Sequence, residues 1–553
     1  MSSTSLGCLI LSGLYLLSFT TKVEALPGQV GSNIAINDKV EEVSWRQWQQ
    51  DNQIHTAISD PGLESVLGVE TLSNESYALQ MVQWFSLKKK LPVSFEYPYR
   101  YLDVTELLKA GNLETQIAGD KLLLRTPLAK INALENKGNT LTLYLDRLVF
   151  WQIDQATVTL RALPVLPISN NGLFTIKTYQ EISQVHVDLP AGYHLSVIGE
   201  TGSTGYKLII EMRPDAMIAK TIKWQPGITL HRDYIKTLAG DSFAITYLEI
   251  DPKIFIAKPI FSNSSKIIGL ARLGKISQKQ MAIAGINGGF FDRISRQPLG
   301  AIKRDRIWFS SPILNRGAVA WDDNGNFKFG RTNWQANISS NEGIQIPLVS
   351  LNSGYIQPGV SVYTPAWDDS YKPSTGKEIV FLVKNDQIQE KIAVSPDSSS
   401  IPIPQDGYLV VQRDLSQSLF KIGSSLQINE QSQDFANFPN ILGAGPLLLN
   451  NGNIVLDAQL ESFKSAFQKQ NASRSGIGIT RKGTVLLIAV HERIHGTGPS
   501  LSEFAQLMKQ LDIIDGLNLD GGSSTSLYLG GQTIDQPLTP PSKVNNTLNF
   551  FKK

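Results

Sequence analysis

Hydrophobic and polar residues alternate along residues 90–225 in short runs that predict β-strands. Turn signals rich in Asn, Gly, Ser and Thr separate these runs. The clearest runs are 121–125, 140–146, 156–161, 185–188 and 207–212. One short helix is predicted at 103–110, where Asp103 or Thr105 can cap its first turn. We therefore predict a mostly-β accessory domain over residues 90–225.

The segments on either side of this region differ in pattern. Residues 26–89 are polar and mixed without a clear period, which predicts a connecting region or a small strand unit. A Pro-Gly pair at 226–227 closes the β-rich region. Beyond it, a strand-like run at 243–251 is followed by a helical pattern near 267–281. We expect residues 230–553 to form a mixed-sheet domain, so the predicted fold class of the chain is α+β.

Length and composition set the scale of the fold and narrow the choice of partners. The chain has 553 residues, of which 42% are hydrophobic and 18% charged, so it is long enough for two or three globular cores. The 51 basic and 49 acidic residues nearly cancel, and the formal net charge is +2. Since no strongly basic segment carries interleaved aromatic residues, we expect neither nucleic acid nor an anionic membrane surface as a partner.

An apolar run near the N-terminus predicts export. Residues 6–19 have the length of a signal-peptide core, and Val23 and Ala25 occupy the small-residue cleavage positions. We predict a signal peptide over residues 1–25, although an uncleaved anchor fits the same run; no other segment reaches membrane-spanning length. The one cysteine, Cys8, lies inside this run. A mature chain without cysteine forms no disulfide, which fits the periplasm or the extracellular space of a bacterium.

The stretch with the most chemistry lies near the C-terminus, at residues 513–525. Leucines alternate there with Asn518 and Asp520, which predicts a strand with one buried face. A glycine pair and three hydroxyl residues follow, namely Gly521, Gly522, Ser523, Ser524 and Thr525. An ordinary hairpin turn explains the glycine pair alone. A carboxylate held beside backbone N–H groups and hydroxyls favours a site where a proton moves and an anion binds.

Three further stretches repeat this combination of glycine and polar residues. The first runs from Asn287 to Asp292 and places two glycines and two phenylalanines after an apolar run. The second, residues 443–450, is a strand that follows a Gly-Pro turn. The third, residues 472–478, sets Arg474 among small residues, where its planar guanidinium can reach an anion unhindered.

In order and spacing, these four stretches resemble the phosphodiester glycosidase family. The resemblance rests on the combination INGGFF, GAGP, ASRSGIG and NLDGGSS and covers roughly residues 230–553. The family includes an enzyme that removes N-acetylglucosamine from its phosphodiester linkage to mannose on lysosomal glycoproteins, together with bacterial envelope and exopolysaccharide members. The resemblance implies that residues 230–553 are a catalytic domain. It implies an exported hydrolase that cleaves the sugar–phosphate bond of a sugar-1-phosphodiester in envelope or exopolysaccharide metabolism.

The resemblance also implies roles for individual residues. Asp520 would be the principal catalytic carboxylate, with Asn287 beside it and Asp292 as a second carboxylate. The implied substrate- and phosphate-binding residues are Arg474, Gly288, Gly289, Asn518, Gly521, Gly522, Ser523, Ser524, His491 and Glu492. Because a phosphate monoester is a good leaving group, a cation and backbone N–H groups could do much of the work. No cofactor is required, although a divalent cation is allowed.

Two departures from the family pattern concern the substrate. Only two glycines precede Ser523, where the family often has three, and His491-Glu492-Arg493 stands where the family usually has Asp-Gly-Arg. With His495, these residues also spell HExxH, the zinc-peptidase motif. That motif needs a helix, whereas here it follows a strand pattern and runs into a Gly-Pro segment. We expect His491 and Glu492 to lie at a strand end on the rim of the site.

A helix is predicted just after this segment, with Ser500 and Glu503 as its capping box.

Two functions remain open beside the glycosidase: a non-catalytic protein that binds phosphorylated glycans, and a zinc peptidase. The expected partner is a phosphorylated glycan or sugar phosphodiester. The accessory domain, in its strand rhythm and its segment around Trp151, loosely resembles modules that contact cell-wall polymers.

Overall fold

A computed structural model describes most of the chain. The described residues are 28–37, 39–154, 156–166, 172–190, 193–203, 205–213, 217–263, 265–415, 417–431, 435, 437–491, 496–535 and 541–553. The predicted signal peptide, residues 1–25, lies outside them. No helix in these ranges is long and apolar enough to cross a membrane.

The protein is mostly β, and the predicted α+β class is wrong. Strands account for 52% of the structure and helices for 7%. The α-helices within the described residues are short: α1 (Asp60–Ser65), α2 (Thr105–Ala110), α3 (Leu273–Lys279), α4 (Ser465–Lys469) and α5 (Leu501–Gln510). The physical reason is that nearly all strand pairs are antiparallel, and antiparallel neighbours need only a turn between them, not a crossover helix.

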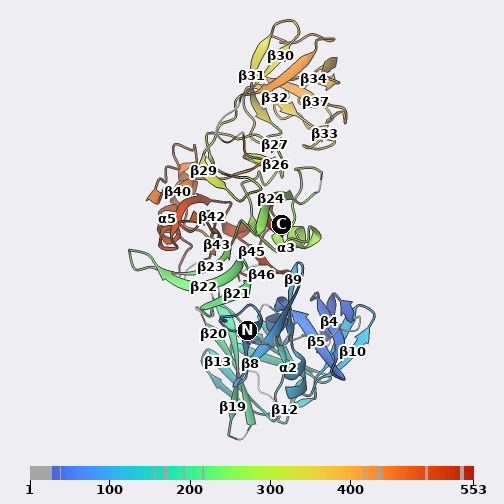
Figure 1. Cartoon of the computed structure of the whole chain (residues 1–553), viewed down its shortest axis with the longest axis vertical. Coiled ribbons are helices and arrows are strands. Elements are labelled where there is room, and N and C mark those ends of the chain that lie inside the picture. Colours follow the sequence, from blue (N-terminus) through green and yellow to red (C-terminus); the bar gives the residue numbers. More distant parts are fainter. Residues whose placement is uncertain are drawn as a thin grey trace, which may run out of the picture.

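Three parts follow one another along the long axis of the molecule (Figure 1). The N-terminal domain, drawn in blue to teal, lies at one end. The central domain, in green and red, combines strands from two distant parts of the sequence. A distal unit, in yellow and orange, is inserted between β29 (Phe327–Arg331) and β39 (Asn440–Gly443) of the central domain.

The N-terminal domain contains four sheets around one core. Its strands are β1 (Gln29–Gly31), β2 (Asn33–Ile36), β3 (Lys39–Glu41), β4 (Trp45–Gln50), β5 (Gln53–Ser59), β6 (Glu70–Thr71), β7 (Leu79–Trp84), β8 (Leu87–Glu96), β9 (Tyr99–Asp103), β10 (Glu114–Ala118), β11 (Lys121–Arg125), β12 (Ala129–Lys137), β13 (Thr140–Leu145), β14 (Trp151–Asp154), β15 (Thr157–Leu160), β16 (Ala162–Pro164), β17 (Phe174–Tyr179), β18 (Ile182–Val187), β19 (His194–Gly202) and β20 (Gly205–Arg213). Each of the five strand runs predicted from the alternating pattern falls on a strand, and the helix predicted at 103–110 is α2. One buried cluster extends from Ile34 to Met212, and the predicted boundary between residues 89 and 90 falls inside β8.

The central domain stacks an eight-stranded sheet against a five-stranded one. The eight-stranded sheet contains β21 (Lys220–Gln225), β22 (Ile228–Lys236), β23 (Ser242–Ile250), β43 (Val485–Val490), β42 (Arg474–Thr480), β44 (Ile513–Asn518), β40 (Leu447–Asn450) and β41 (Asn453–Ile454) in this order. The five-stranded sheet contains β24 (Phe255–Phe261), β47 (Asn546–Lys552), β25 (Ala284–Asn287), β45 (Leu527–Leu529) and β46 (Gln532–Thr533). A second five-stranded sheet, β27 (Ile307–Ser310), β26 (Ile302–Arg304), β39, β28 (Gly317–Trp321) and β29, completes the domain.

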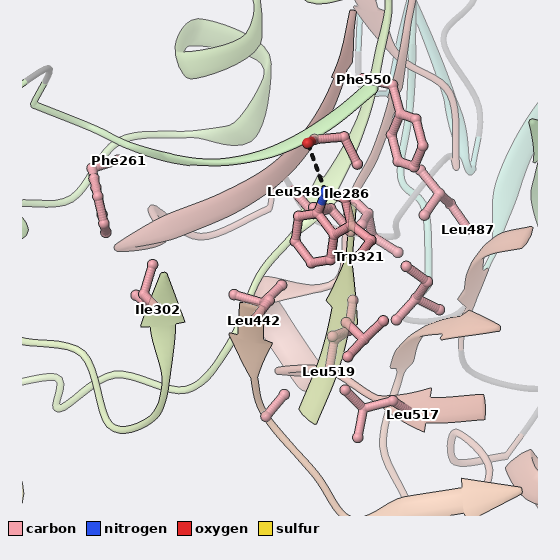
Figure 2. Close-up of a cluster of buried hydrophobic side chains, with 14 of the residues drawn as sticks. Phe261, Ile286, Ile302, Trp321, Leu442, Leu487, Leu517, Leu519, Leu548 and Phe550 are labelled. Carbon is pink, nitrogen blue, oxygen red and sulfur yellow. Dashed lines mark hydrogen bonds between the residues drawn. The ribbon is translucent and has the colours of Figure 1, made fainter. Parts of the chain in front are cut away.

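The core of the central domain explains why these sheets stay together. Leu487 and Leu517 of the first sheet meet Ile286 and Phe550 of the second in one buried cluster (Figure 2). β43 is buried along its whole length, because this cluster covers one face while α5 covers the other. The helix predicted after Ser500 is therefore confirmed as α5, and its capping box with Glu503 is present.

The distal unit continues this core on one face and has its own cluster on the other. Its strands are β30 (Ala336–Ser340), β31 (Gln345–Leu351), β32 (Gly359–Tyr363), β33 (Ser370–Tyr371), β34 (Glu378–Lys384), β35 (Gln387–Ala393), β36 (Ile401–Pro402), β37 (Gly407–Arg413) and β38 (Leu426–Glu430). The sequence predicts no boundary on either side of this unit.

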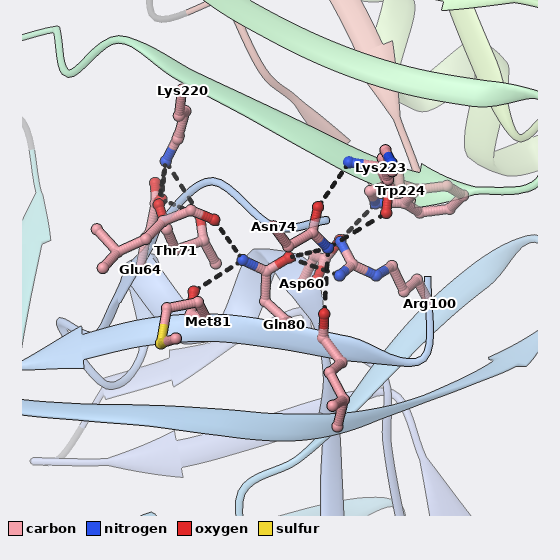
Figure 3. Close-up of polar contacts among 12 residues, drawn as sticks. Asp60, Glu64, Thr71, Asn74, Gln80, Met81, Arg100, Lys220, Lys223 and Trp224 are labelled. Carbon is pink, nitrogen blue, oxygen red and sulfur yellow. Dashed lines mark hydrogen bonds and ion pairs between the residues drawn. The ribbon is translucent and has the colours of Figure 1, made fainter. Parts of the chain in front are cut away.

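Buried polar contacts join the N-terminal and central domains (Figure 3). The ammonium of Lys220 lies 2.7 Å from a carboxylate oxygen of Glu64. Trp224 and Arg100 both donate hydrogen bonds to the carboxylate of Asp60. Burial opposes ionisation of Glu64, but the positive charges of Lys220 and Arg232 outweigh it and lower the pKa of Glu64 to about 2. The contacts of Lys220 with Glu64 and of Trp224 with Asp60 connect β21 of the central domain to the N-terminal domain.

Candidate functional site

Strand pairing brings three of the four glycine-containing stretches together with His491. β42 pairs antiparallel with both β44 and β43, with Gly476 opposite Asn518 and Arg474 opposite Val490. The beginning of β42 therefore lies beside the end of β44 and the end of β43, which His491 follows. The remaining stretch, which begins at Asn287, comes from the second sheet, where β25 ends at that residue.

A ring of hydrogen bonds connects these segments. Asn287 donates to the backbone oxygen of Asp520 at 2.6 Å, and its side-chain oxygen accepts from the backbone N–H of Ser526 at 3.1 Å. The next residue, Leu527, donates its N–H to Asp535 at 2.9 Å, and Asp535 also contacts His491.

The ring closes through the loop after Asp520. The other nitrogen of His491 lies 3.4 Å from the hydroxyl of Ser473. The backbone oxygen of Ser473 accepts from the N–H of Gly522 at 2.7 Å, and Gly521 donates its N–H to the Asp520 carboxylate at 3.0 Å. Four segments distant in sequence thus hold one another in a single geometry, with Asp520 as the carboxylate on the loop.

Asp520 is half-buried as a residue, and protein surrounds its carboxyl group. Enclosure is the largest influence on its carboxyl group and raises its pKa to about 6. Hydrogen bonds from the Ser524 hydroxyl and the Gly521 N–H, and the positive charge of Arg293, oppose this shift without cancelling it. A carboxyl group with a pKa near 6 exchanges protons close to neutral pH, which is the range in which a general acid or base works best.

Asn287 and Asn518 are buried and hold the backbone around this carboxylate. Besides Asp520, Asn287 contacts the hydroxyl of Ser475 at 2.7 Å. Asn518 donates to the backbone oxygens of Gly445 and Leu519, both at 2.8 Å. The Gly-Pro turn of the second stretch is thereby tied to the end of β44.

The glycines of the site allow close packing of the backbone. A Cβ atom on Gly288 would lie 2.0 Å from the side-chain oxygen of Asn546, and one on Gly289 would lie 2.2 Å from the backbone oxygen of Gly443. The N–H groups of both glycines already donate to Asn546. The N–H groups of Gly521 and Gly522 are likewise used within the ring. The visible role of these glycines is therefore structural, and substrate binding by them stays a prediction.

We expect Gly289→Ala to destabilise the protein strongly. The new methyl group would meet the backbone oxygen of Gly443, which cannot move without breaking strand β39. The loss in free energy of unfolding should be about 3 kcal/mol or more, at or above the upper end of overpacking costs. Gly274→Ala in α3 is the matched control, because the nearest atom to its methyl group would be 3.8 Å away. Denaturant unfolding checks both variants; equal midpoints would contradict the close-packing argument.

Arg474 is buried and fastens two loops. Its guanidinium donates to the backbone oxygens of Pro499 (3.1 Å) and Gln470 and lies over the ring of Phe467. Loss of hydration lowers its pKa to about 10, and no carboxylate among the described residues offsets this. A buried cation without a counter-charge suits an anion, although its visible hydrogen bonds are structural.

Asp292 ends the first stretch and Arg293 follows it, but their side chains make different interactions. The Asp292 carboxylate caps a turn by accepting from the N–H groups of Ile294 (3.0 Å) and Ser295 (2.7 Å), and these bonds lower its pKa. Arg293 is exposed, and its charge acts on Asp520. Arg293 forms no ion pair with any residue that the structure describes.

The hydroxyl residues after the glycine pair take different positions. Ser524 is buried and donates to the Asp520 carboxylate, whereas Ser523 is exposed and its backbone oxygen accepts from the N–H of Ser542. Both follow Gly522, whose positive φ of 60° turns the chain at this point.

The proposed zinc motif begins at a strand end. His491 follows β43 directly, and α5 starts only at Leu501. Glu492 and His495 lie outside the described residues. Within the part of the chain that the structure describes, no three His, Cys, Asp or Glu side chains cluster closely enough to hold a metal ion.

Sequence reasoning missed three polar residues and an aromatic cluster. Arg293 directly follows the first stretch and could have been flagged by position, and Ser473 lies inside the third. Asp535 had no local signal, because only the fold brings it to His491. The aromatic cluster contains Phe290, Phe463 and Phe467, with Arg316 over the ring of Phe463 at 4.2 Å.

The C-terminal part of the chain is similar to a known protein family. Residues 377–551 match the family model described as phosphodiester glycosidase, a span that holds three of the four stretches. The chain is similar to the crystal structure of a hypothetical protein from Synechocystis, with 38% identity, a TM-score of 0.88 and coverage of 95% of this chain and 99% of that one. The N-acetylglucosamine-1-phosphodiester alpha-N-acetylglucosaminidases of Mus musculus and Homo sapiens are each 28% identical over 109 residues. Those matches cover 18% of this chain and 21% of each relative, so they span about a fifth of the curated relatives' length. Residues 377–551 thus resemble the phosphodiester glycosidase family.

Proposed function

We propose that this protein hydrolyses the sugar–phosphate bond of a sugar-1-phosphodiester, releasing the sugar and a phosphate monoester. The observation that carries the proposal is the enclosed Asp520 carboxylate, which is held in a ring of hydrogen bonds with Arg293 close by. Family members are hydrolases that act on phosphodiester glycosidic bonds. The curated relatives are named for N-acetylglucosamine-1-phosphodiesters, so this sugar is the first to test.

Asp520 is proposed as the general base toward water. Enclosure raises its pKa to about 6, so the carboxylate form dominates at pH 7 and is a stronger base than an ordinary aspartate. Water activated by this carboxylate attacks the anomeric carbon, and the bond from that carbon to the phosphate oxygen breaks. Asn287 acts as a positioning residue, because it holds the backbone of Asp520.

Arg293 is proposed as the principal phosphate-binding residue, supported by Arg474. Phosphodiesters carry negative charge, and a guanidinium binds phosphate oxygens with two parallel hydrogen bonds. Arg293 is exposed and acts electrostatically on Asp520, which places a cation beside the proposed base. Arg474 adds positive potential from the interior, where protein screens charge less than water does.

The proposal also covers where the protein acts and whether it needs a cofactor. The apolar run over residues 6–19 and the absence of cysteine from the rest of the chain support export to a bacterial envelope. Cell fractionation that leaves the protein in the cytoplasm would contradict it. We propose that catalysis needs no cofactor, since guanidinium groups can bind the phosphate; a divalent ion that assists them is allowed.

The test is release of reducing sugar from N-acetylglucosamine-1-phosphodiesters, with and without EDTA. Release that resists EDTA would support a metal-independent glycosidase. Release that EDTA abolishes would support the same reaction with a required metal ion. Saturable binding of these diesters without release would instead favour the non-catalytic glycan-phosphate binding protein.

A further inference from the structure

Ser473, His491 and Asp535 form a hydroxyl–imidazole–carboxylate chain beside Asp520. His491 contacts the Asp535 carboxylate at 2.8 Å through one ring nitrogen and the Ser473 hydroxyl at 3.4 Å through the other. Asp535 has no exposed side-chain surface, and 15% of the His491 side chain is exposed. This hydrogen-bonded series therefore leads from a buried carboxylate to the partly exposed His491.

Each end of this chain is fixed by the backbone of the site. The second oxygen of Asp535 accepts the N–H of Leu527 at 2.9 Å, so the carboxylate cannot turn away from His491. The backbone oxygen of Ser473 accepts a hydrogen bond from the N–H of Gly522. A Cβ atom on Gly521 would lie 2.7 Å from the same backbone oxygen. Ser473 is thus in direct contact with the loop that carries Asp520.

A carboxylate on one ring nitrogen determines where the histidine holds its proton. It keeps a hydrogen on the nitrogen that faces it and stabilises positive charge on the ring. The other nitrogen is then free to exchange a proton with the hydroxyl. Histidine is the side chain whose ordinary titration lies nearest to neutral pH, and phosphate monoesters take up their second proton in the same range.

We propose that Ser473, supplied by His491 and positioned by Asp535, donates the proton that the departing phosphate takes up. The inference rests on the proposed function. As water bonds to the anomeric carbon, its proton passes to the Asp520 carboxylate. The bond from that carbon to the phosphate oxygen breaks, and the oxygen keeps the electron pair. His491 enters this step as the imidazolium, with a proton on each ring nitrogen. The phosphate oxygen takes the proton of the Ser473 hydroxyl, and Ser473 takes the proton from Nδ1 of His491, the ring nitrogen that lies 3.4 Å from it. Solvent later removes the proton from Asp520 and restores the one on His491.

This arrangement differs from that of another histidine in the same sheet. His231 lies between the Thr221 hydroxyl at 3.3 Å and a carboxylate oxygen of Glu249 at 3.6 Å. It sits in β22, whereas the hydrogen-bond ring joins β25, β42 and β44. His231 therefore offers a matched control, with the same chemical groups in the same domain but outside the ring.

The experiment compares two substrates with the same sugar. The phosphodiester has a leaving group that takes up a proton, whereas the glycosyl fluoride has one that leaves without it. We expect His491→Gln and Ser473→Ala to lower kcat on the phosphodiester about 10- to 100-fold. This is the low end of general-acid effects, because phosphate is already a good leaving group. Turnover of the fluoride should stay within about twofold of wild type.

Asp535→Asn tests positioning separately from folding. It should reproduce the selective loss on the phosphodiester, since the wrong ring nitrogen would then carry the proton. His231→Gln should change neither substrate. Variants with unchanged thermal midpoints that hydrolyse the phosphodiester as fast as wild type would overturn the relay and leave the proposed function standing. Equal losses on both substrates would also overturn it, as would loss of structure alone. A wild-type protein that releases sugar from neither substrate would overturn the proposed function and the relay with it.

Discussion

Asp520→Asn is expected to lower turnover of a sugar-1-phosphodiester by at least about 10³-fold while leaving binding within a fewfold of wild type. The amide keeps the size and most hydrogen bonds of the carboxylate but cannot accept a proton from water, and lost general-base catalysis typically costs 10²- to 10⁴-fold. Initial rates and calorimetric binding of the diester check the two parts separately. Asp146→Asn in the N-terminal domain is the control, because that carboxylate lies outside the hydrogen-bond ring and contacts Lys130 and Arg147.

The pH dependence follows from the same enclosure. In the wild type, kcat/KM should fall as pH drops below about 6, because Asp520 is then protonated and has lost its basicity. A profile that stays flat from pH 7 down to pH 4.5 would mean that Asp520 is not the base. The acid limb should be absent from the residual activity of Asp520→Asn.

The same substitution should stabilise the fold at neutral pH. A raised pKa means that the folded protein disfavours the carboxylate, so the cost is absent below pH 4 and complete above about pH 6. One pKa unit corresponds to about 1.4 kcal/mol, and partial exposure reduces the total, so we expect Asp520→Asn to gain about 1–3 kcal/mol at pH 7.5 and nothing at pH 4. Asp292→Asn should show the opposite sign at pH 7.5, because hydrogen bonds lower the pKa of Asp292. Thermal unfolding at the two pH values checks both; a gain at pH 4 equal to that at pH 7.5 would contradict the electrostatic origin.

Arg293→Met is the second change with a large expected effect. It should lower kcat/KM for the phosphodiester about 10²-fold, mainly through KM, because charge-assisted hydrogen bonds to the phosphate are lost in both ground and transition states. A glycosyl fluoride of the same sugar should be much less affected. The acid limb of the pH profile should also move to higher pH, since the charge of Arg293 lowers the pKa of Asp520.

Two matched variants separate this role from general surface charge. Arg296→Met removes a cation three residues away on the same loop and should leave kcat/KM within about twofold of wild type. Arg293→Lys keeps the charge but not the planar fork, so it should lie between wild type and Arg293→Met. If Arg293→Met binds and hydrolyses the diester like wild type, the phosphate is held elsewhere.

Strands could be predicted from the sequence better than fold class. The alternation at 121–125 corresponds to β11 residue by residue, because one face of that strand is buried and the other is not. The helical pattern near 267–281 contains only the short α3, because the backbone N–H groups of Ile267 and Ala271 donate to Ala366 and Val544 and not within a helix. No boundary of the distal unit was predicted, and one face of its sheet joins the core of the central domain while the other has a cluster of its own.

The site was partly visible in the sequence for a definite reason. Glycines that permit close backbone contact occur next to the residues they position, so Asn287 and Asp520 could be found from local patterns. The same patterns did not reveal that the glycine N–H groups are already bonded within the protein. Asp535 lies 44 positions from His491, and only strand pairing brings their side chains together.

The most direct test of the central claim is hydrolysis of the phosphodiester in water labelled with ¹⁸O, with the products analysed by mass spectrometry. Attack at the anomeric carbon leaves the phosphate oxygens untouched, so the account predicts a phosphate monoester without ¹⁸O. One ¹⁸O atom in the phosphate product would show attack at phosphorus and would contradict a glycosidase.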